Sequence, residues 1–567
     1  GFPMIQGLTY TYGISSLPGT LVDNIYVVKG ANSVLQGFES ISGQINVMTK
    51  DPEKTDKLMV NAYANSFGER HLNANFAVKK NRWSNLTAVH FIRPANKTDR
   101  DSDQFLDLPL LTRYAVFNKW KYGNDNENGW FSQIGTRYTH EQRRGGQRMF
   151  DIDRDKGSTS IYGQHVLIQQ PEIWNKTGYR FNDKHSITAY TSAFVQQQRS
   201  NFGSTQYQAA QRNLYSNLQW EFAYDAHALK AGISYRHLHL NEQIAFTDTF
   251  LLRNDAGKYL REEHIPGVFA ENTMRFWDNK LTWLAGVRLD HHNKFGQRFT
   301  PRMLLKYDIR PGTVVRGNIG TGWRTVNLFC ENIGLLVSLR DIVFAEALAP
   351  EQAVNAGVNF THNFEPENNT ISGFISLDFY HTNFQNQIFP DYDIDPQKAI
   401  IQNFRGKSIS NGFQAEVFVR LQEKFELKTG YNFLEVFRMV NGTKQLLPFN
   451  PMHKLSGTFS YKPEGNPYHL DVNVHWYGKQ RLLDTKSNPT EFQQPDFSKP
   501  FTVVNAQFTY NFKRVEWYGG CENLFDFRQL RPINSWQDPF SPYFDTSFAL
   551  GPTRGREIYV GARFYVR

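Results

Sequence analysis

The feature that most constrains this chain is an alternation of apolar and polar residues that recurs in short segments from about Lys57 to the C-terminus. In LTWLAGVRLD (281–290) every second position, from Leu281 to Leu289, carries an apolar side chain, and the segments 413–422, 469–478 and 557–567 repeat the pattern. A period of two places alternate side chains on opposite faces of an extended strand. Each segment therefore predicts a β-strand with one apolar and one polar face.

The length and aromatic content of these segments favour a membrane sheet over a soluble one. They run about ten residues and often end in aromatic residues, as in outer-membrane barrels, and aromatics make up 15% of the chain. A soluble all-β protein is the alternative. In lipid every backbone polar group must be paired within the protein, so the sheet must close. The predicted fold class is an all-β membrane protein, an antiparallel transmembrane β-barrel.

The connections between the segments support this prediction. Short turn-like breaks at 79–82, 181–185 and 223–227 contrast with long irregular stretches at 94–112 and 140–172. In outer-membrane barrels short turns face the periplasm and long loops face the outside. The side chains expected to face lipid include Trp283, Val417, Val472, Trp476 and Phe564.

Composition excludes several classes of function. The net charge is +9, but there is no run of five or six Lys and Arg, so nucleic acid is not an expected partner. The two cysteines, Cys330 and Cys521, lie far apart in the sequence and form no CxxC zinc motif. We also find no nucleophile elbow, HExxH or phosphate loop. We therefore do not expect an enzyme.

The stretch before the alternating region has another character. VVKGANSVLQGFESISGQINVMTK (27–50) is punctuated by glycines. We expect Gly30, Gly37 and Gly43 to form turns with positive φ. Strands are expected at Ile25–Val28 and Ile45–Met48.

These residues resemble the end of the plug domain of TonB-dependent outer-membrane receptors. KGANS (29–33), LQG (35–37) and SGQINVMTK (42–50) are similar to the family's Lys/Arg-Gly-Pro-x-Ser turn, Tyr-Gly pair and Gly-Gly-INIxTK run, with departures at Ala31, Gln36 and Ser42. Three later segments are also similar to family signatures, at 299–329, 348–362 (with Asn355 for the usual acidic residue) and 520–526.

The resemblance implies a barrel of about 22 strands around a partial plug. It predicts that residues 1–52 are the C-terminal part of the plug and residues 53–567 the barrel. It also implies that a signal peptide, a TonB box and the first half of the plug are missing from these 567 residues, whereas a barrel with a vestigial plug is the alternative.

The function that the resemblance implies is TonB-dependent active import of a scarce nutrient across the outer membrane of a Gram-negative bacterium. The expected cargo is a ferric siderophore or another metal chelate. Energy would come from the TonB–ExbB–ExbD complex, acting through a segment outside this chain, and the outer wall would meet outer-membrane lipid and lipopolysaccharide. Haem or cobalamin import remains an alternative, as does a structural or adhesive barrel subunit of a surface complex.

The first candidate substrate-binding site is MIQGLTYTYG (4–13), which in the family rises to the top of the plug. We expect Met4, Gln6, Tyr10 and Tyr12 to contact substrate. In an extended loop both tyrosine rings would lie on one side, facing a cavity open to the outside. Packing of this loop against the barrel wall is the alternative.

The second candidate is THEQRRGGQRMFDIDRD (139–155), expected to form a long outward loop. Arg143, Arg144 and Arg148 could bind an anionic ligand through charge-assisted hydrogen bonds, with Arg144 and Arg148 above the same cavity as the tyrosines. Contact with anionic lipopolysaccharide is the alternative for these arginines.

Two metal sites are also considered. Asp151, Asp153 and Asp155 alternate ahead of Gly157 and could hold calcium in an extracellular loop, as could the similar stretch 99–107; a solvated acidic loop is the alternative. His237 and His239 share one strand face and could bind a transition metal, or be ordinary rim histidines. A change of apolar parity between Ile233 and Leu238 predicts a β-bulge there.

Overall fold

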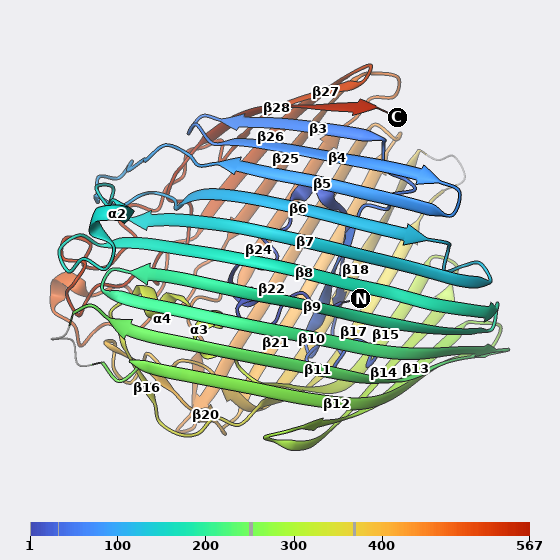
Figure 1. The fold of residues 1–567 in the computed structure, drawn as a ribbon, viewed down its shortest axis with the longest axis horizontal. Helices are drawn as coiled ribbons and strands as arrows, with labels where there is room; N and C mark the ends of the chain where they lie inside the picture. The colour runs from blue at the N-terminus through green and yellow to red at the C-terminus, as the bar shows by residue number, and fades with distance from the viewer. Residues whose placement is uncertain (1, 32, 249–252, 367–369, 567) are drawn as a thin grey trace.

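The wall of the molecule is a closed antiparallel β-sheet (Figure 1). The computed structural model describes residues 2–31, 33–248, 253–366 and 370–566. Because the short strands β20 and β23 only extend neighbouring pairs, the barrel has 22 strands, in agreement with the fold class and strand number expected above.

The first half of the wall contains β3 (Leu58–Asn65), β4 (Arg70–Lys80), β5 (Trp83–Arg93), β6 (Leu110–Tyr122), β7 (Gly129–Gly146), β8 (Gly163–Asn182), β9 (His185–Phe202), β10 (Thr205–Tyr224), β11 (His227–Phe246), β12 (Gly257–Phe276) and β13 (Leu281–His292). The second half contains β14 (Gly296–Arg310), β15 (Thr313–Arg324), β17 (Glu351–Phe364), β18 (Ile371–Ile388), β20 (Asn403–Phe404), β21 (Ser408–Leu421), β22 (Phe425–Val440), β23 (Thr443–Leu446), β24 (His453–Tyr461), β25 (Tyr468–Tyr477), β26 (Phe501–Phe512), β27 (Val515–Glu522) and β28 (Glu557–Val566). Closure is made by β28 pairing with β3.

Two small sheets lie apart from the wall. One is the antiparallel pair β1 (Val22–Lys29) and β2 (Gly43–Thr49), and the other is the parallel pair β16 (Asp341–Phe344) and β19 (Lys398–Ile401). The helical elements are α1 (Thr9–Tyr12), α2 (Ile152–Asp155), α3 (Leu328–Glu331), α4 (Gly334–Val337), η1 (Gly19–Leu21) and η2 (Thr490–Phe492). In the described part of the chain, no helix has the length and apolarity needed to cross a membrane.

The alternating apolar residues of the sequence form the outer face of the barrel, and the residues between them face the lumen. On β13, Val287 is 47% exposed, whereas its neighbour Arg288 is 4% exposed and points into the lumen. Trp283 shares the parity of Val287, and Val417 lies opposite the exposed Ile375 of β18. Val472 and Trp476 share a face with the exposed Val474, and Phe564 is itself exposed. The five side chains expected to face lipid therefore all lie on the outer face.

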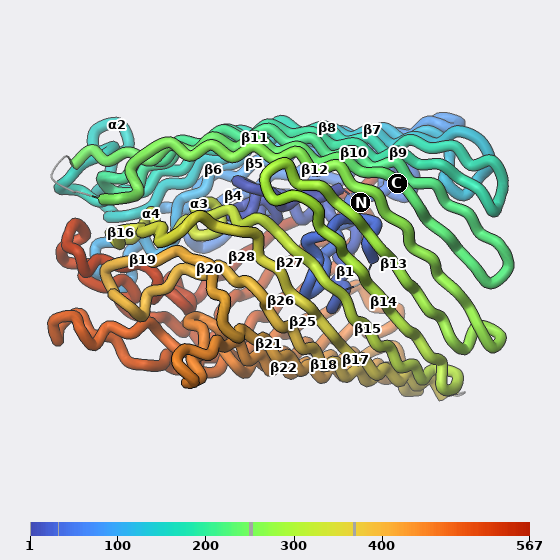
Figure 2. The backbone as a smooth tube through the Cα atoms, turned by 90° about the horizontal axis from the view of Figure 1, so that it is seen from below, coloured from blue at the N-terminus to red at the C-terminus, as the bar shows by residue number. Residues whose placement is uncertain are grey.

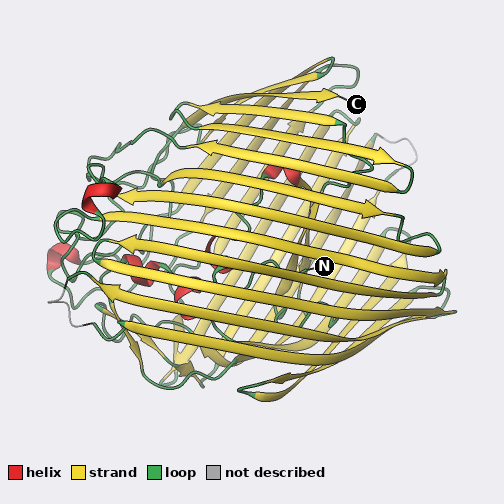
Figure 3. Ribbon diagram, in the orientation of Figure 1, coloured by secondary structure: helices red, strands yellow, loops and turns green. Residues whose placement is uncertain are grey.

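The wall is uneven in height. Strands β10, β11 and β12 each have 20 residues, whereas β13 has 12. The register between β12 and β13 runs only from Gly267 to Phe276, so the first half of β12 pairs with β11 alone among the described strands. The long connections lie at this taller end, and Figure 3 shows helices α2, α3 and α4 there.

The N-terminal residues lie inside the barrel (Figure 2). The strands expected at Ile25–Val28 and Ile45–Met48 are present as β1 and β2, paired antiparallel. Gly30, Gly37 and Gly43 have φ of 74°, 127° and 149°, as predicted. A Cβ on Gly30 would lie 2.5 Å from the side-chain oxygen of Asn318 on β15, so glycine also allows this turn to approach the wall.

Candidate functional site

The N-terminal segment is fastened to the wall by hydrogen bonds with inward-facing side chains. Lys29 Nζ lies 2.6 Å from Asp378 Oδ2 of β18, and the amide of Val34 donates to Glu271 of β12 at 3.0 Å. On β14, Arg302 donates to the carbonyl of Ser33 at 2.6 Å. Since these contacts come from three separate strands, the segment is held at several points along one part of the wall.

A cavity of about 790 Å³, here called the lumen cavity, separates this segment from part of the wall. Its lining includes Met4, Tyr10, Phe38, Arg236 and Arg288. Phe38 stacks on Trp323 with the ring centres 4.0 Å apart. The guanidinium groups of Arg236 and Arg288 lie 5.2 and 5.9 Å from the Phe38 ring. The cavity thus combines a packed aromatic ring with two arginines, which are themselves paired with Glu39 and Asp290.

The expected extended loop carrying the tyrosines is instead the helical turn α1, so the prediction of one shared side was wrong. In a helix, residues two positions apart point to different sides. Tyr10 lines the lumen cavity, whereas Tyr12 turns to β7. Burial, together with the charges of Glu39 and Glu331, raises the pKa of Tyr10 to about 12, so its hydroxyl stays protonated at neutral pH.

The top of α1 is covered rather than open to the outside. The hydroxyl of Thr11 donates to the carbonyl of Cys330 in α3. Leu8, Phe329 and Leu336 belong to a buried apolar cluster that joins this cover to the inner faces of β8, β10 and β11. The expectation that Tyr10 and Tyr12 face an outward-open cavity is therefore also wrong for this conformation.

Two more residues of the first candidate site have defined positions. Gln6 is buried beside Asn213 and Arg236, and its backbone amide bonds to Thr9 Oγ1 at 2.7 Å. Met4 lines the lumen cavity, and its carbonyl accepts from Thr9 Oγ1. Gln6 therefore matches the alternative of wall packing, and Met4 and Tyr10 reach a cavity.

The three arginines of the second candidate site do not act together. Strand β7 continues to Gly146, so Arg143 and Arg144 point to opposite faces. Arg143 faces the lumen, 4.1 Å from the centre of the Tyr12 ring, and pairs with Glu141. Arg144 pairs across the sheet with His165 on the outer face. Arg148 is exposed in the following turn, where its amide bonds to the carbonyl of Gln104. The prediction that Arg144 overhangs a cavity shared with the tyrosines was wrong.

A second cavity, here called the loop cavity, lies between the β25–β26 connection and the β27–β28 connection. Its volume is about 430 Å³, and its lining includes Lys499, Phe501, Phe527 and Arg528. The rings of Phe501 and Phe527 stack with centres 5.1 Å apart. These residues were not singled out in the sequence, because nothing local relates 499–501 to 527–528.

The aspartates expected to bind calcium already have partners. Asp151 caps α2 by accepting from the amides of Asp153 and Arg154 at 3.0 and 3.3 Å. Asp155 pairs with Arg154 at 2.7 Å. The calcium hypothesis for these residues remains a prediction. In the 99–107 stretch, Asp99, Asp101 and Asp107 bring carboxylate oxygens within 4.8 Å of one another.

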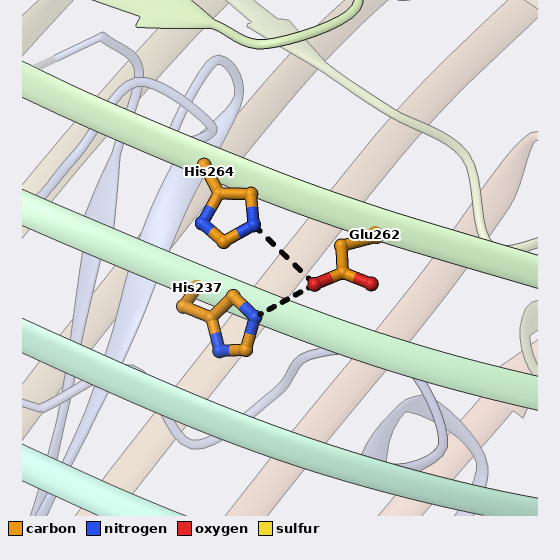
Figure 4. Close-up of side chains that lie close together, drawn as sticks. All are labelled: His237, Glu262 and His264. Carbon is orange, nitrogen blue, oxygen red and sulfur yellow. Dashed lines mark ion pairs between the residues drawn. The ribbon is translucent and has the colours of Figure 1, made fainter.

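His237 and His239 face outward on β11, but without the expected bulge. The register of β11 with β10 is unbroken from Phe246 to His227. The apolar parity changes because Leu238 and Leu240 join the apolar cluster inside the barrel mouth. Two neighbours that the sequence analysis missed, Glu262 and His264 of β12, lie beside the histidines (Figure 4).

The chain matches the model of a known protein family. The family model described as "TonB dependent receptor-like, beta-barrel" matches residues 63–524. The chain belongs to the TonB-dependent receptor family. The receptor is thus an outer-membrane β-barrel protein, and its family and fold are those of transport receptors.

Curated relatives share low identity with the receptor. The ferrienterobactin receptor of Escherichia coli K12 is 22% identical over 295 residues, which are 50% of this chain but only 39% of that protein. The ferric enterobactin receptor PirA of Pseudomonas aeruginosa is 22% identical over 614 residues, covering 96% of this chain and 79% of PirA.

Solved structures agree in fold. A mutant of the ferric enterobactin receptor PfeA of Pseudomonas aeruginosa has a TM-score of 0.71 at 13% identity, covering 97% of this chain and 86% of that one. The siderophore receptor PiuA of Acinetobacter baumannii has a TM-score of 0.69 at 13% identity, covering 96% and 86%. At such identities the likeness concerns the fold.

Proposed function

We propose that this receptor imports a ferric siderophore across the outer membrane, with energy supplied by the TonB–ExbB–ExbD complex. The observation that carries the proposal is the similarity to a ferric enterobactin receptor along 96% of the chain. The filled lumen supports it, since residues bonded to β12, β14 and β18 must move before a solute can pass.

We further propose that residues 1–52 are the C-terminal part of a plug and that residues 53–567 are the barrel. The pair β1–β2 is hydrogen bonded within itself and stands apart from the wall, which begins at Leu58. Ile25, Val27 and Ile45 of this pair are exposed apolar residues within the lumen. An apolar sheet face of this kind is suited to packing against further protein.

The chemistry of the loop cavity supports an anionic, aromatic cargo. Stacked Phe501 and Phe527 offer flat apolar surfaces, and Lys499 and Arg528 offer positive charge. Ferric catecholates combine aromatic rings with net negative charge, so both features would contribute to binding. On this proposal, the loop cavity makes an early contact and the lumen cavity, with Tyr10, Arg236 and Arg288, a later one.

Binding of chelates to the purified receptor tests the cargo. Quenching of tryptophan fluorescence would be titrated with a ferric catecholate, a ferric hydroxamate, haem and cobalamin. The proposal predicts tightest binding of the catecholate, weakened about tenfold or more in Lys499→Ala/Arg528→Ala, since hydrogen bonds to charged groups contribute about 1.5–3 kcal/mol. The exposed Lys513→Ala, in the turn between β26 and β27, is the control. Preference for haem or cobalamin, or no binding of any chelate, would contradict it.

A further inference from the structure

The outer face of β11 and β12 changes character along its length. Ile233 of β11 and Val268 of β12 are 57% and 52% exposed, as expected for residues facing lipid. Toward the long connection between these strands the outer face carries His237, Glu262 and His264. These groups lie immediately beyond the apolar band, at the level of the outer interface.

The strand register brings the ligand-type side chains together. His237 lies directly opposite His264, and His239 directly opposite Glu262. Residues two apart on a strand share a face, and directly opposed residues have Cβ atoms about 4.5–5.5 Å apart. His237, His239, Glu262 and His264 therefore form a compact block, here called the histidine cluster. Figure 4 shows His237, Glu262 and His264 of this cluster.

The distances within the histidine cluster match those around a tetrahedral metal ion. Glu262 Oε1 lies 3.5 Å from His237 Nε2 and 3.3 Å from His264 Nε2. Two ligands about 2.0–2.1 Å from a tetrahedral zinc lie about 3.3 Å from each other. Both spacings exceed those of a good N–H···O hydrogen bond, about 2.7–3.2 Å. The ligand atoms of His237, Glu262 and His264 all lie within 4.8 Å of one another, so one metal ion could contact all three side chains.

Neighbouring groups orient two of these ligands. His264 Nδ1 lies 2.8 Å from the hydroxyl oxygen of Tyr235. Donation of Nδ1–H to that oxygen leaves the lone pair of Nε2 directed toward Glu262. The second carboxylate oxygen, Oε2, is 3.1 Å from His239 Nδ1. Such outer partners fix the tautomer and direction of metal ligands in proteins.

The two imidazole rings also lie against each other. The rings of His237 and His264 stack with centres 4.7 Å apart and an angle of 29°. The stacking holds both imidazoles beside the carboxylate of Glu262.

The histidine cluster lies where β12 is no longer flanked by β13. Above Gly267, strand β12 is no longer paired with β13 in the described residues. There the loop residue Asn293 makes hydrogen bonds to backbone groups of Glu262 and His264. A link between His237 of β11 and Glu262 and His264 of β12 would therefore hold the less supported half of β12.

We propose that His237, Glu262 and His264 bind a divalent transition metal, with Zn²⁺ the best match to two imidazoles and a carboxylate, and that the ion fastens the upper half of β12 to β11. Water fills the fourth position, and His239 and Tyr235 act as orienting partners. This site is independent of the imported cargo.

Isothermal titration of the chelator-stripped receptor in detergent tests the site, with Zn²⁺ as the probe and Ca²⁺ in parallel. We expect one Zn²⁺ per receptor to be lost, or weakened at least about 100-fold, in His237→Ala/His264→Ala, since removal of outer partners alone costs about 10–100-fold. Tyr235→Phe should weaken the same site by about 10-fold or more. Ca²⁺ should not occupy it, because Ca²⁺ prefers oxygen ligands.

His381→Ala is the matched control, because His381 also faces outward but lies opposite Asn411, without a carboxylate. It should leave Zn²⁺ binding unchanged. Equal stoichiometry and affinity in the wild type and the double variant would overturn the site. Hydrogen exchange in residues 257–266 should slow on Zn²⁺ addition in the wild type only, and unchanged exchange with Zn²⁺ bound would overturn the fastening role.

Discussion

The guanidinium of Arg143 lies 4.1 Å from the centre of the Tyr12 ring, which joins the N-terminal segment in the lumen to strand β7 of the wall. Arg143 is also paired with Glu141, whose other partner is Arg113. The contact therefore ties Tyr12 to a charge network on the inner face of the barrel. It is an aromatic–cation contact that a moving lumen segment would have to break.

The first prediction concerns this contact. Arg143→Ala should weaken the attachment of α1 to the wall. A cation–π contact contributes about 0.5 kcal/mol when exposed and about 2 kcal/mol when shielded from water. Hydrogen exchange in residues 4–13 should become roughly 2- to 30-fold faster. Arg144→Ala is the matched control, because its side chain lies on the opposite face of the same strand. Equal exchange in both variants would show that the contact does not hold the segment.

A second prediction concerns Phe38 of the lumen segment, whose ring stacks on Trp323 of β15 with the ring centres 4.0 Å apart. Phe38→Ala should destabilise the packing of residues 34–41 by about 3–5 kcal/mol, as for other buried aromatic truncations. Hydrogen exchange by mass spectrometry on this segment is the readout. Phe181→Ala, at an exposed position near the end of β8, should have no effect there. Unaltered protection of residues 34–41 would mean that other contacts place the turn.

A third prediction concerns the stability cost of an arginine introduced at two depths on the outer face of β11. Ile233→Arg should lower the free energy of unfolding from lipid vesicles by about 2–4 kcal/mol, whereas Asn241→Arg should cost only about 0–1 kcal/mol, because the cost of arginine falls toward the interface. Both side chains point outward, and Asn241 lies beyond the histidine cluster. Similar costs at both positions would contradict the proposed position of the apolar band.

Features of the fold and of the candidate sites could be predicted from the sequence when they depend on residues close together in the chain. Side-chain parity is a property of a single strand, so Trp283 and Phe564 could be assigned to the outer face from their own segments. The partners of His237 could not, because Glu262 and His264 become neighbours only through the register between β11 and β12. No feature of either strand alone specifies that register.

Two further differences have local causes. Residues 139–146 were expected to form a loop, but they continue strand β7. If the alternating pattern had been followed a few residues further, Arg143 and Arg144 would have been assigned to opposite faces of that strand. The turn α1 is only four residues long and is stabilised by contact with Cys330 of α3, which is distant in the sequence. A helix of that length has no sequence signature strong enough to predict Tyr10 and Tyr12 on different sides.

A fourth prediction concerns pH and the acidic loop 99–107. Burial, with the charges of Asp101 and Asp99, raises the pKa of Asp103 to about 6. A raised carboxyl pKa means that the folded loop favours the protonated form, so the loop should be most stable at low pH and lose stability as pH rises through about 4 to 6. Exchange of the Phe105 amide, which donates to Asp103, corrected for intrinsic rates, should accelerate over that range.

Asp103→Asn should abolish this dependence, because an amide keeps the acceptor oxygen without titrating. Asp183→Asn, in an exposed turn on the other side of the barrel, should leave it intact. A pH dependence that persists in Asp103→Asn would assign it to another group.

The central claim is energised import of a ferric siderophore, and uptake of radioactive iron by cells tests it most directly. A strain lacking this receptor would be complemented with its full gene, in the presence and absence of a functional TonB, and supplied with iron-loaded catecholate siderophore. The account predicts uptake only when the receptor and TonB are both present. Uptake that is independent of TonB, or no difference between strains with and without the receptor for any ferric siderophore, would contradict it.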